Sequence, residues 1–186
     1  MRVLIDACVL YPTVLREIVL GVAGQGLYTP LWSDRILGEW THAAARLGPV
    51  GQDVARGEVA VLSAQWPEAT VGADAVAHAA RAFDVSLPDP DDAHVLAAAI
   101  AGGADLILTL NLRDFPRARL APQGMHAEHP DSFLLGLYRQ TPDPVARVLA
   151  RVQARTERIS GQVQPLRALL KRASLPRLGK ALDARS

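Results

Sequence analysis

Two short apolar runs, each followed by polar residues, limit the possible folds more than any other feature of the sequence. They are residues 2–6 (RVLID) and residues 105–110 (DLILTL). Short, nearly continuous apolar runs are typical of strands that are buried on both faces of a parallel sheet. Most of the other segments have helical periodicity, and this alternation of strands and helices predicts an α/β fold with a central parallel sheet.

The remaining elements follow from turn residues and periodicity. Ser33 or Asp34 is expected to cap a helix, because small polar side chains are favoured at that position. A short extended segment is expected around residues 69–71. The other predicted elements are strands over residues 27–31 and 124–127, and helices over residues 12–22, 51–66, 72–83, 93–102, 130–140, 144–159 and 165–173.

The stretch LPDPDDAHVLAAA, residues 87–99, places Asp89, Asp91 and Asp92 immediately before an apolar helix. One face of this helix is expected to be buried, because its apolar residues have helical spacing. Aspartate is a favoured helix N-cap, and one carboxylate is enough for that purpose. Three carboxylates in four positions repel each other unless cations or solvent screen them, so a cation site is the alternative explanation.

Other polar residues are expected where the parallel strands end, at the same edge of the sheet as Asp92. Asp6 ends the first apolar run, and Thr109, Asn111 and Asp114 lie at or after the end of the second. Ligands of open α/β sheets bind at the carboxyl ends of the strands, although each of these residues could also belong to an ordinary turn. Glu39 falls along the apolar stripe of its helix, so its carboxylate either lies at the boundary of the core or points into a cleft.

Carboxylates without a lysine nearby fit hard divalent cations such as Mg²⁺ or Mn²⁺. These ions activate water and neutralise charge on phosphate oxygens. No lysine occurs before Lys171, which excludes a P-loop and argues against receiver-type and haloacid-dehalogenase-type sites. The segment GVAGQG at residues 21–26 follows a predicted helix, so it is not a dinucleotide-binding fingerprint.

Charge is divided unevenly along the chain. Residues 1–132 hold 9 basic and 16 acidic residues, whereas residues 133–186 hold 11 basic and 3 acidic ones. Four arginines form a stripe that faces solvent, phosphate or an acidic partner: Arg147, Arg151, Arg155 and Arg158. With 49% hydrophobic residues, one cysteine, no secretory signal and no apolar run of membrane-spanning length, the chain is expected to be globular, cytoplasmic and not membrane-bound.

Several blocks together resemble the PIN-domain ribonucleases, most closely the VapC-like toxins with a helical C-terminal extension. These blocks are VLIDACVLYP at the start, Glu39, LPDPDDAHVLAAAIAGGADLILTLNLRDF in the middle and the following HPDSFL. The resemblance implies a three-layer α/β/α fold with a central parallel sheet. It also implies a PIN-like nuclease domain over residues 1–140 and a helical C-terminal extension over residues 141–186.

By this resemblance, the acidic set for catalysis and metal binding is Asp6, Glu39, Asp92 and Asp114. Thr109 and Asn111 match the polar residues that support this set. Cys8 stands where related sequences commonly have asparagine, so we expect altered hydrogen bonding near Asp6 without loss of activity.

The function implied by the resemblance is Mg²⁺- or Mn²⁺-dependent cleavage of single-stranded RNA. The protein would be the homodimeric toxin of a toxin–antitoxin pair, neutralised by a small antitoxin protein. Two alternatives stay open: a PIN-fold binding module without activity, and a housekeeping PIN nuclease.

Overall fold

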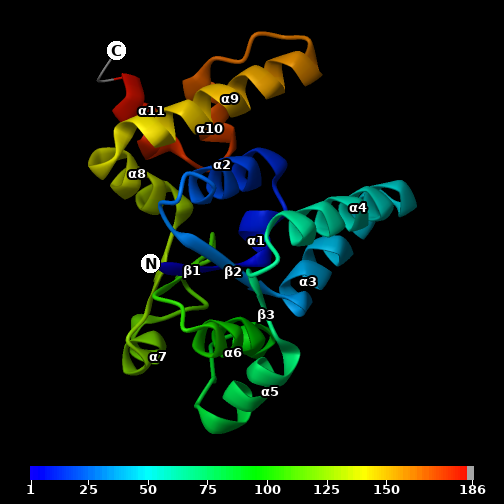
Figure 1. Ribbon diagram of the computed structural model, residues 1–186, viewed down its shortest axis with the longest axis vertical. Helices are drawn as coiled ribbons and strands as arrows, with labels where there is room; N and C mark the ends of the chain where they lie inside the picture. Colours follow the sequence, from blue (N-terminus) through cyan, green and yellow to red (C-terminus); the bar gives the residue numbers. More distant parts are fainter. Residues whose placement is uncertain (184–186) are drawn as a thin grey trace. The chain divides into compact units, whose positions relative to one another are not determined.

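The computed structural model describes residues 1–183, and within them the strands form one parallel five-stranded sheet (Figure 1). The strand order is β3-β2-β1-β4-β5, with bounds β1 (Arg2–Ile5), β2 (Thr29–Ser33), β3 (Thr70–Val71), β4 (Leu106–Leu108) and β5 (His126–Glu128). Leu4 of the central strand is in register with Leu31 on one side and Ile107 on the other. All three side chains are buried, as expected for strands in the middle of a covered sheet.

The chain folds into two compact units. The first consists of Met1–Tyr11 and Thr29–Glu128, and the second of Pro12–Tyr28 and the chain from His129 onward. The first unit holds the sheet and the helices α1 (Ala7–Leu10), α3 (Asp34–Ala44), α4 (Pro49–Gln65), α5 (Ala73–Ala82), α6 (Ala93–Gly102) and α7 (Arg117–Leu120). The second unit holds α2 (Thr13–Ala23), α8 (Pro130–Gln140), α9 (Pro142–Ser160), α10 (Leu166–Arg172) and α11 (Pro176–Asp183).

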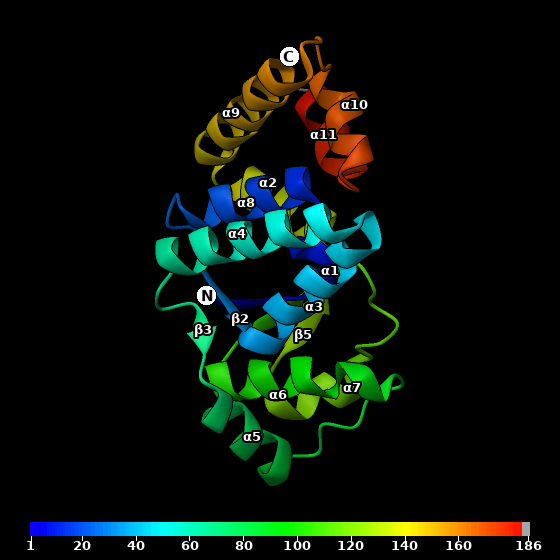
Figure 2. The same cartoon turned by 90° about the vertical axis from the view of Figure 1, so that its right-hand side faces the viewer.

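Helix α6 is buried on more than the one face that its helical spacing predicts. Periodicity predicts one buried face, but every residue from Val95 to Ala99 is buried. The reason is that α6 contacts the sheet and is also covered by α5 (Figures 1 and 2). A Cβ atom at Gly102 would lie 3.0 Å from side-chain atoms of Leu31 and Val71, so glycine permits this close approach to the sheet.

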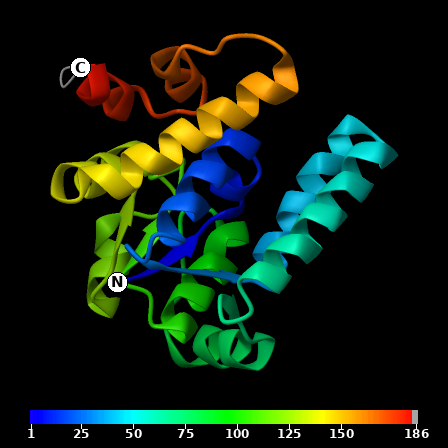
Figure 3. The same cartoon turned by 45° about the horizontal axis from the view of Figure 1, so that its top comes forward.

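Helices α3 and α4 run side by side in the first unit (Figure 3). The predicted cap of α3 is confirmed, because Ser33 Oγ accepts a hydrogen bond from the backbone N–H of Ile36 at 3.3 Å. Ile36 and Trp40 are fully or almost fully buried and fix the rotation of α3 about its axis. Glu39 lies on the same helix, so this packing also determines the direction in which its side chain projects.

In the second unit, α9 contacts both α2 and α8, while α11 contacts α8 and α10. The ring of Tyr28 packs edge-on against Phe133, with ring centroids 5.1 Å apart. The carboxylate of Asp131 on α8 accepts backbone hydrogen bonds from Arg177 and Leu178, both at 2.9 Å. Asp131 therefore caps the first turn of α11 from a neighbouring helix.

Part of the arginine stripe on α9 is engaged within this second unit. Arg155 forms an ion pair with Glu17 of α2 at 3.3 Å, and Arg147 donates a hydrogen bond to Gln25 at 3.3 Å. The Arg155 side chain remains more than half exposed, so this ion pair adds little stability. These two arginines therefore face α2 and the segment after it.

Several predicted elements differ in extent from the observed ones. Strand β2 begins at Thr29 instead of residue 27, since Tyr28 belongs to the second unit. Strand β4 covers only three residues, because the chain turns after Thr109. Helix α11 was not predicted, because its short apolar pattern is stabilised by a cap from α8 that is distant in sequence.

The predicted fold class is confirmed: an α/β fold with a central parallel sheet, flanking helices and additional C-terminal helices. Within residues 1–183, no helix has the length and apolar character needed to cross a membrane.

Candidate active site

Asp6 follows β1 directly, and two side chains from neighbouring segments hold its carboxylate. The fully buried Thr109 hydroxyl donates to Asp6 Oδ2 at 2.7 Å, and the Cys8 thiol donates to the same oxygen at 3.0 Å. Asp6 occupies the N-cap position of α1 but makes no side-chain capping hydrogen bond. Its carboxylate is therefore oriented by the end of β4 and by Cys8, and does not cap the helix.

Cys8 extends this network to the backbone of the segment after β4. The backbone N–H of Leu110 donates to Cys8 Sγ at 3.2 Å, so the sulfur accepts one hydrogen bond and donates another. Burial, followed by the negative charge of Asp6, raises the pKa of Cys8 to about 12. The hydrogen bonding near Asp6 thus runs through a protonated thiol at neutral pH.

Asn111 and Asp114 form a turn just after β4. The backbone N–H of Asn111 donates to Thr109 Oγ1 at 3.0 Å, and Asn111 Nδ2 donates to the Asp114 carboxylate. The backbone N–H of Asp114 also donates to the carbonyl of Asn111 at 3.3 Å. These contacts alone describe an Asn/Asp turn, and it is the position of Asp114 beside Asp92 that connects the turn to a site.

Asp92 immediately precedes α6, and its surroundings disfavour its negative charge. Burial, then the charges of Asp6, Asp114 and Asp89, and a hydrogen bond with Asp114 raise its pKa from 3.8 to about 6. Asp92 makes no side-chain capping hydrogen bond. By contrast, Asp89 Oδ1 accepts from the backbone N–H of Asp91 at 2.9 Å, so Asp89 caps the preceding turn. The capping explanation thus fits Asp89, while Asp92 lies among other carboxylates.

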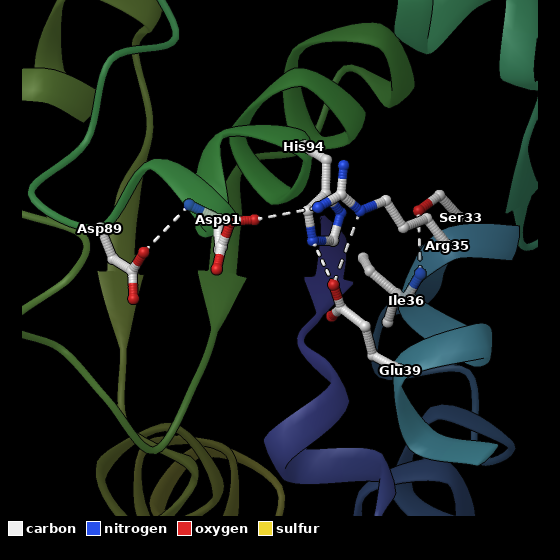
Figure 4. Close-up of polar contacts among 7 residues, drawn as sticks. All are labelled: Ser33, Arg35, Ile36, Glu39, Asp89, Asp91 and His94. Carbon is white, nitrogen blue, oxygen red and sulfur yellow. Dashed lines mark hydrogen bonds and ion pairs between the residues drawn. The ribbon is translucent and has the colours of Figure 1, made fainter. Parts of the chain in front are cut away.

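Glu39 contacts the beginning of α6 from α3 (Figure 4). Its Oε1 atom lies 2.6 Å from His94 Nε2 and 3.6 Å from Arg35 Nε. Arg35 Nη2 also donates to the backbone carbonyl of Asp91 at 3.5 Å. The Glu39 side chain is 40% exposed, which places its carboxylate at the boundary between the protein and solvent. It meets α6 two residues beyond Asp92.

His94 belongs to this region, although the sequence pattern alone did not indicate it. His94 lies in the first turn of a helix whose next residues are all buried, and its own side chain is only 8% exposed. A polar side chain at such a position has to find its partner on another element, because buried polar groups are usually hydrogen-bonded or paired. The place of His94 beside a run of apolar helical residues was therefore the sequence signal that could have identified it. This signal does not indicate that Glu39 is its partner.

The structure places Asp6 and Asp114 close enough to Asp92 to raise its pKa, and Glu39 contacts the start of the same helix. Within residues 1–183, no three His, Cys, Asp or Glu side chains are already arranged as metal ligands around one point. The chemistry of the donors nevertheless fits a hard divalent cation, because all four are carboxylates. Burial, together with the charges of the neighbouring carboxylates, raises the pKa of Asp92, as expected where carboxylates gather.

Comparison with known proteins identifies the family. Residues 2–113 match the PIN domain family, and because they make up more than half of the chain, the chain belongs to this family. Over 44 residues it is 52% identical to "Putative ribonuclease VapC50" of Mycobacterium tuberculosis. That stretch covers 24% of this chain and 26% of the relative. No solved structure matches the chain. The resemblance to PIN-domain, VapC-like ribonucleases is thus confirmed.

Proposed function

We propose that this protein is a divalent-metal-dependent endoribonuclease that cleaves single-stranded RNA. The observation that carries the proposal is the accumulation of negative charge around Asp92, where Asp6 and Asp114 approach it from the ends of two neighbouring strands. Membership of the PIN domain family supports it, as does the short stretch shared with a protein named as a ribonuclease.

Mg²⁺ or Mn²⁺ would be held by Asp6, Glu39, Asp92 and Asp114, with Thr109 and Asn111 in supporting roles. When bound, the ion would supply an activated water and would stabilise charge on phosphate oxygens. The protein's own contribution is orientation. Thr109 and Cys8 both donate to Oδ2 of Asp6, and Asn111 donates to Asp114, so two of the carboxylates are fixed by hydrogen bonds before any ion binds.

Exposed arginines near these carboxylates would hold the RNA backbone. Arg35 lies beside Glu39 with 61% of its side chain exposed, and the exposed Arg113 lies within the turn that carries Asp114. Guanidinium groups pair well with phosphate oxygens, and such contacts position a nucleic acid without reading its sequence.

We further propose that the nuclease is the toxin of a type II toxin–antitoxin system. Its partners would then be a small antitoxin protein and a second copy of the chain, and it would act in the cytoplasm. The VapC name of the relative supports this role. We also propose residues 1–140 as the nuclease domain and residues 141–186 as its helical extension. The compact units differ from this division, because Pro12–Tyr28 groups with the chain from His129 onward.

The test is cleavage of a mixed cellular RNA pool by the wild-type protein, Asp6→Asn and Asp92→Asn, each with Mg²⁺, with Mn²⁺ and with EDTA. The matched control is Asp74→Asn, which changes an exposed carboxylate in the first turn of α5. We expect cleavage by the wild type and the control in either metal, no cleavage in EDTA, and loss of cleavage in both site variants.

The alternatives predict different results. A binding module would not cut RNA in any condition, even when it is folded and free of an antitoxin. A housekeeping nuclease would cut RNA but would not arrest growth when expressed, and no neighbouring small gene would be needed to rescue the cells. Unchanged cleavage by both Asp6→Asn and Asp92→Asn would refute the proposed site.

A further inference from the structure

His94 is a buried imidazole without a satisfactory hydrogen bond. Its side chain is 8% exposed, and within residues 1–183 its Nδ1 atom has no partner. Its Nε2 atom lies 2.6 Å from Glu39 Oε1 (Figure 4), and this contact is not a hydrogen bond. Burying a polar ring without hydrogen bonds is unfavourable. The contact with Glu39 is the main interaction that offsets the cost of burying the His94 imidazole.

Both nitrogen-bearing neighbours of Glu39 approach the same carboxylate oxygen. His94 Nε2 and Arg35 Nε lie 2.6 Å and 3.6 Å from Oε1, whereas Oε2 has no ion pair or hydrogen bond within residues 1–183. Arg35 is 61% exposed and more distant, so solvent weakens its hold on the carboxylate. The buried and closer His94 is therefore the main restraint on Glu39.

We propose that His94 is a positioning residue for the divalent cation: it holds Oε1 of Glu39 and leaves Oε2 available as a metal ligand. This inference rests on the proposed nuclease function and adds a residue to its metal site. His94 does not contact RNA or the cation and acts only through Glu39.

The physical reason is the freedom of the glutamate side chain. Glu39 is 40% exposed and extends from α3, whereas Asp92, which would share the ion with it, precedes α6. Without a restraint, Glu39 would lose several rotamers on binding the ion, and this entropy cost weakens binding. Side chains that orient a metal ligand in this way typically change metal affinity by about 10-fold to 100-fold. Because Glu39 would be one ligand among four, we expect about a tenfold effect.

The experiment is calorimetric titration of Mn²⁺ into the folded, RNA-free protein at one fixed pH. The variants are His94→Leu, His94→Gln, Glu39→Gln and the double variant His94→Leu/Glu39→Gln. The matched control is His78→Leu, which changes an exposed histidine on α5 in the same unit. We expect about tenfold weaker Mn²⁺ binding for His94→Leu. His94→Gln should restore most of the affinity, because its amide N–H can donate to Oε1 and replace the contact made by the imidazole.

The double variant separates positioning from a general structural effect. If His94 acts through Glu39, adding His94→Leu to Glu39→Gln should weaken Mn²⁺ binding no further. An equal loss in both backgrounds would overturn the proposal. Tighter Mn²⁺ binding by His94→Leu would also overturn it, because His94 would then hold Glu39 away from the ion. If His94→Leu does not fold, the comparison is His94→Gln with His94→Asn, whose shorter amide should not reach Glu39, and equal affinities would refute the role.

The same measurements distinguish failure of the proposed nuclease function from failure of the proposed role of His94. Wild-type protein that binds Mn²⁺ but does not cut RNA would contradict the nuclease, while the titrations would still decide the role of His94. Wild-type protein that binds no Mn²⁺ would overturn the role of His94 as well.

Discussion

Asp92→Asn should stabilise the metal-free protein, although it removes a residue of the candidate active site. Burial and the neighbouring charges of Asp6 and Asp114 raise the pKa of Asp92 from 3.8 to about 6. Between these two pH values the folded protein binds more protons at this position than the unfolded chain does. Stability contributed by the protonated form is therefore present at low pH and is lost as the pH rises through 6. Asparagine does not ionise and avoids this loss.

The size of the effect follows from the shift in pKa. A difference of about two pKa units corresponds to at most ~3 kcal/mol in the free energy of unfolding. The Asp92 side chain is only partly buried, so solvent screening reduces the expected gain to about 1 kcal/mol at pH 7.5. For a chain of this length that gain raises the melting temperature by about 2–4 °C. At pH 4 the variant and the wild type should have nearly equal stability.

The assay is thermal and urea denaturation in EDTA at pH 4 and pH 7.5. The control is Asp84→Asn, because hydrogen bonds from Ser86 lower the pKa of Asp84 and predict the opposite sign at pH 7.5. In excess Mn²⁺ the order of wild type and Asp92→Asn should reverse, since an ion at 100 times its Kd stabilises the folded protein that binds it by about 2.7 kcal/mol. An Asp92→Asn variant that is no more stable than wild type at pH 7.5 in EDTA would refute the reasoning.

Two further predictions concern the second unit. Asp131→Ala should lower the free energy of unfolding, measured by urea denaturation, by about 2 kcal/mol, because it removes a buried cap of α11. The control Asp143→Ala, at an exposed position, should change it by less than about 0.5 kcal/mol. Gly21→Ala should destabilise by about 1–3 kcal/mol, because its Cβ would lie 2.7 Å from Val148 Cγ1. Gly57→Ala, in a helix of the first unit with open space around it, should stabilise by about 0.5–1 kcal/mol. Equal effects of the two glycine substitutions would contradict the packing argument.

The sheet and the three clustered aspartates could be predicted because they depend on local patterns and a general rule. Continuous apolar runs identify buried parallel strands, and the carboxyl ends of such strands meet at one edge of the sheet. β1 and β4 are neighbours in the observed sheet, which brings Asp6 and the turn carrying Asp114 together. Ser33 was predictable in the same way, since N-capping is local in sequence.

Features that depend on contacts between distant segments could not be predicted. Residues 95–101 of α6 are apolar on every face, but no local pattern identifies α5 as the element that covers its outer side. Helix α11 depends on a carboxylate 46 positions earlier in the chain, so its own short pattern was not enough to identify it. The grouping of Pro12–Tyr28 with the C-terminal helices is likewise a result of tertiary packing.

Cys8 stands where the resemblance implies asparagine, and it makes both kinds of hydrogen bond that an asparagine side chain can make. Asparagine carries an amide that can donate and accept, and the thiol of Cys8 does both, donating to Asp6 and accepting from the backbone of Leu110. A thiolate at this position would repel the Asp6 carboxylate, but burial and Asp6 itself raise the pKa of Cys8 to about 12. Burial and the negative charge of Asp6 therefore keep Cys8 protonated at neutral pH and able to donate to Asp6.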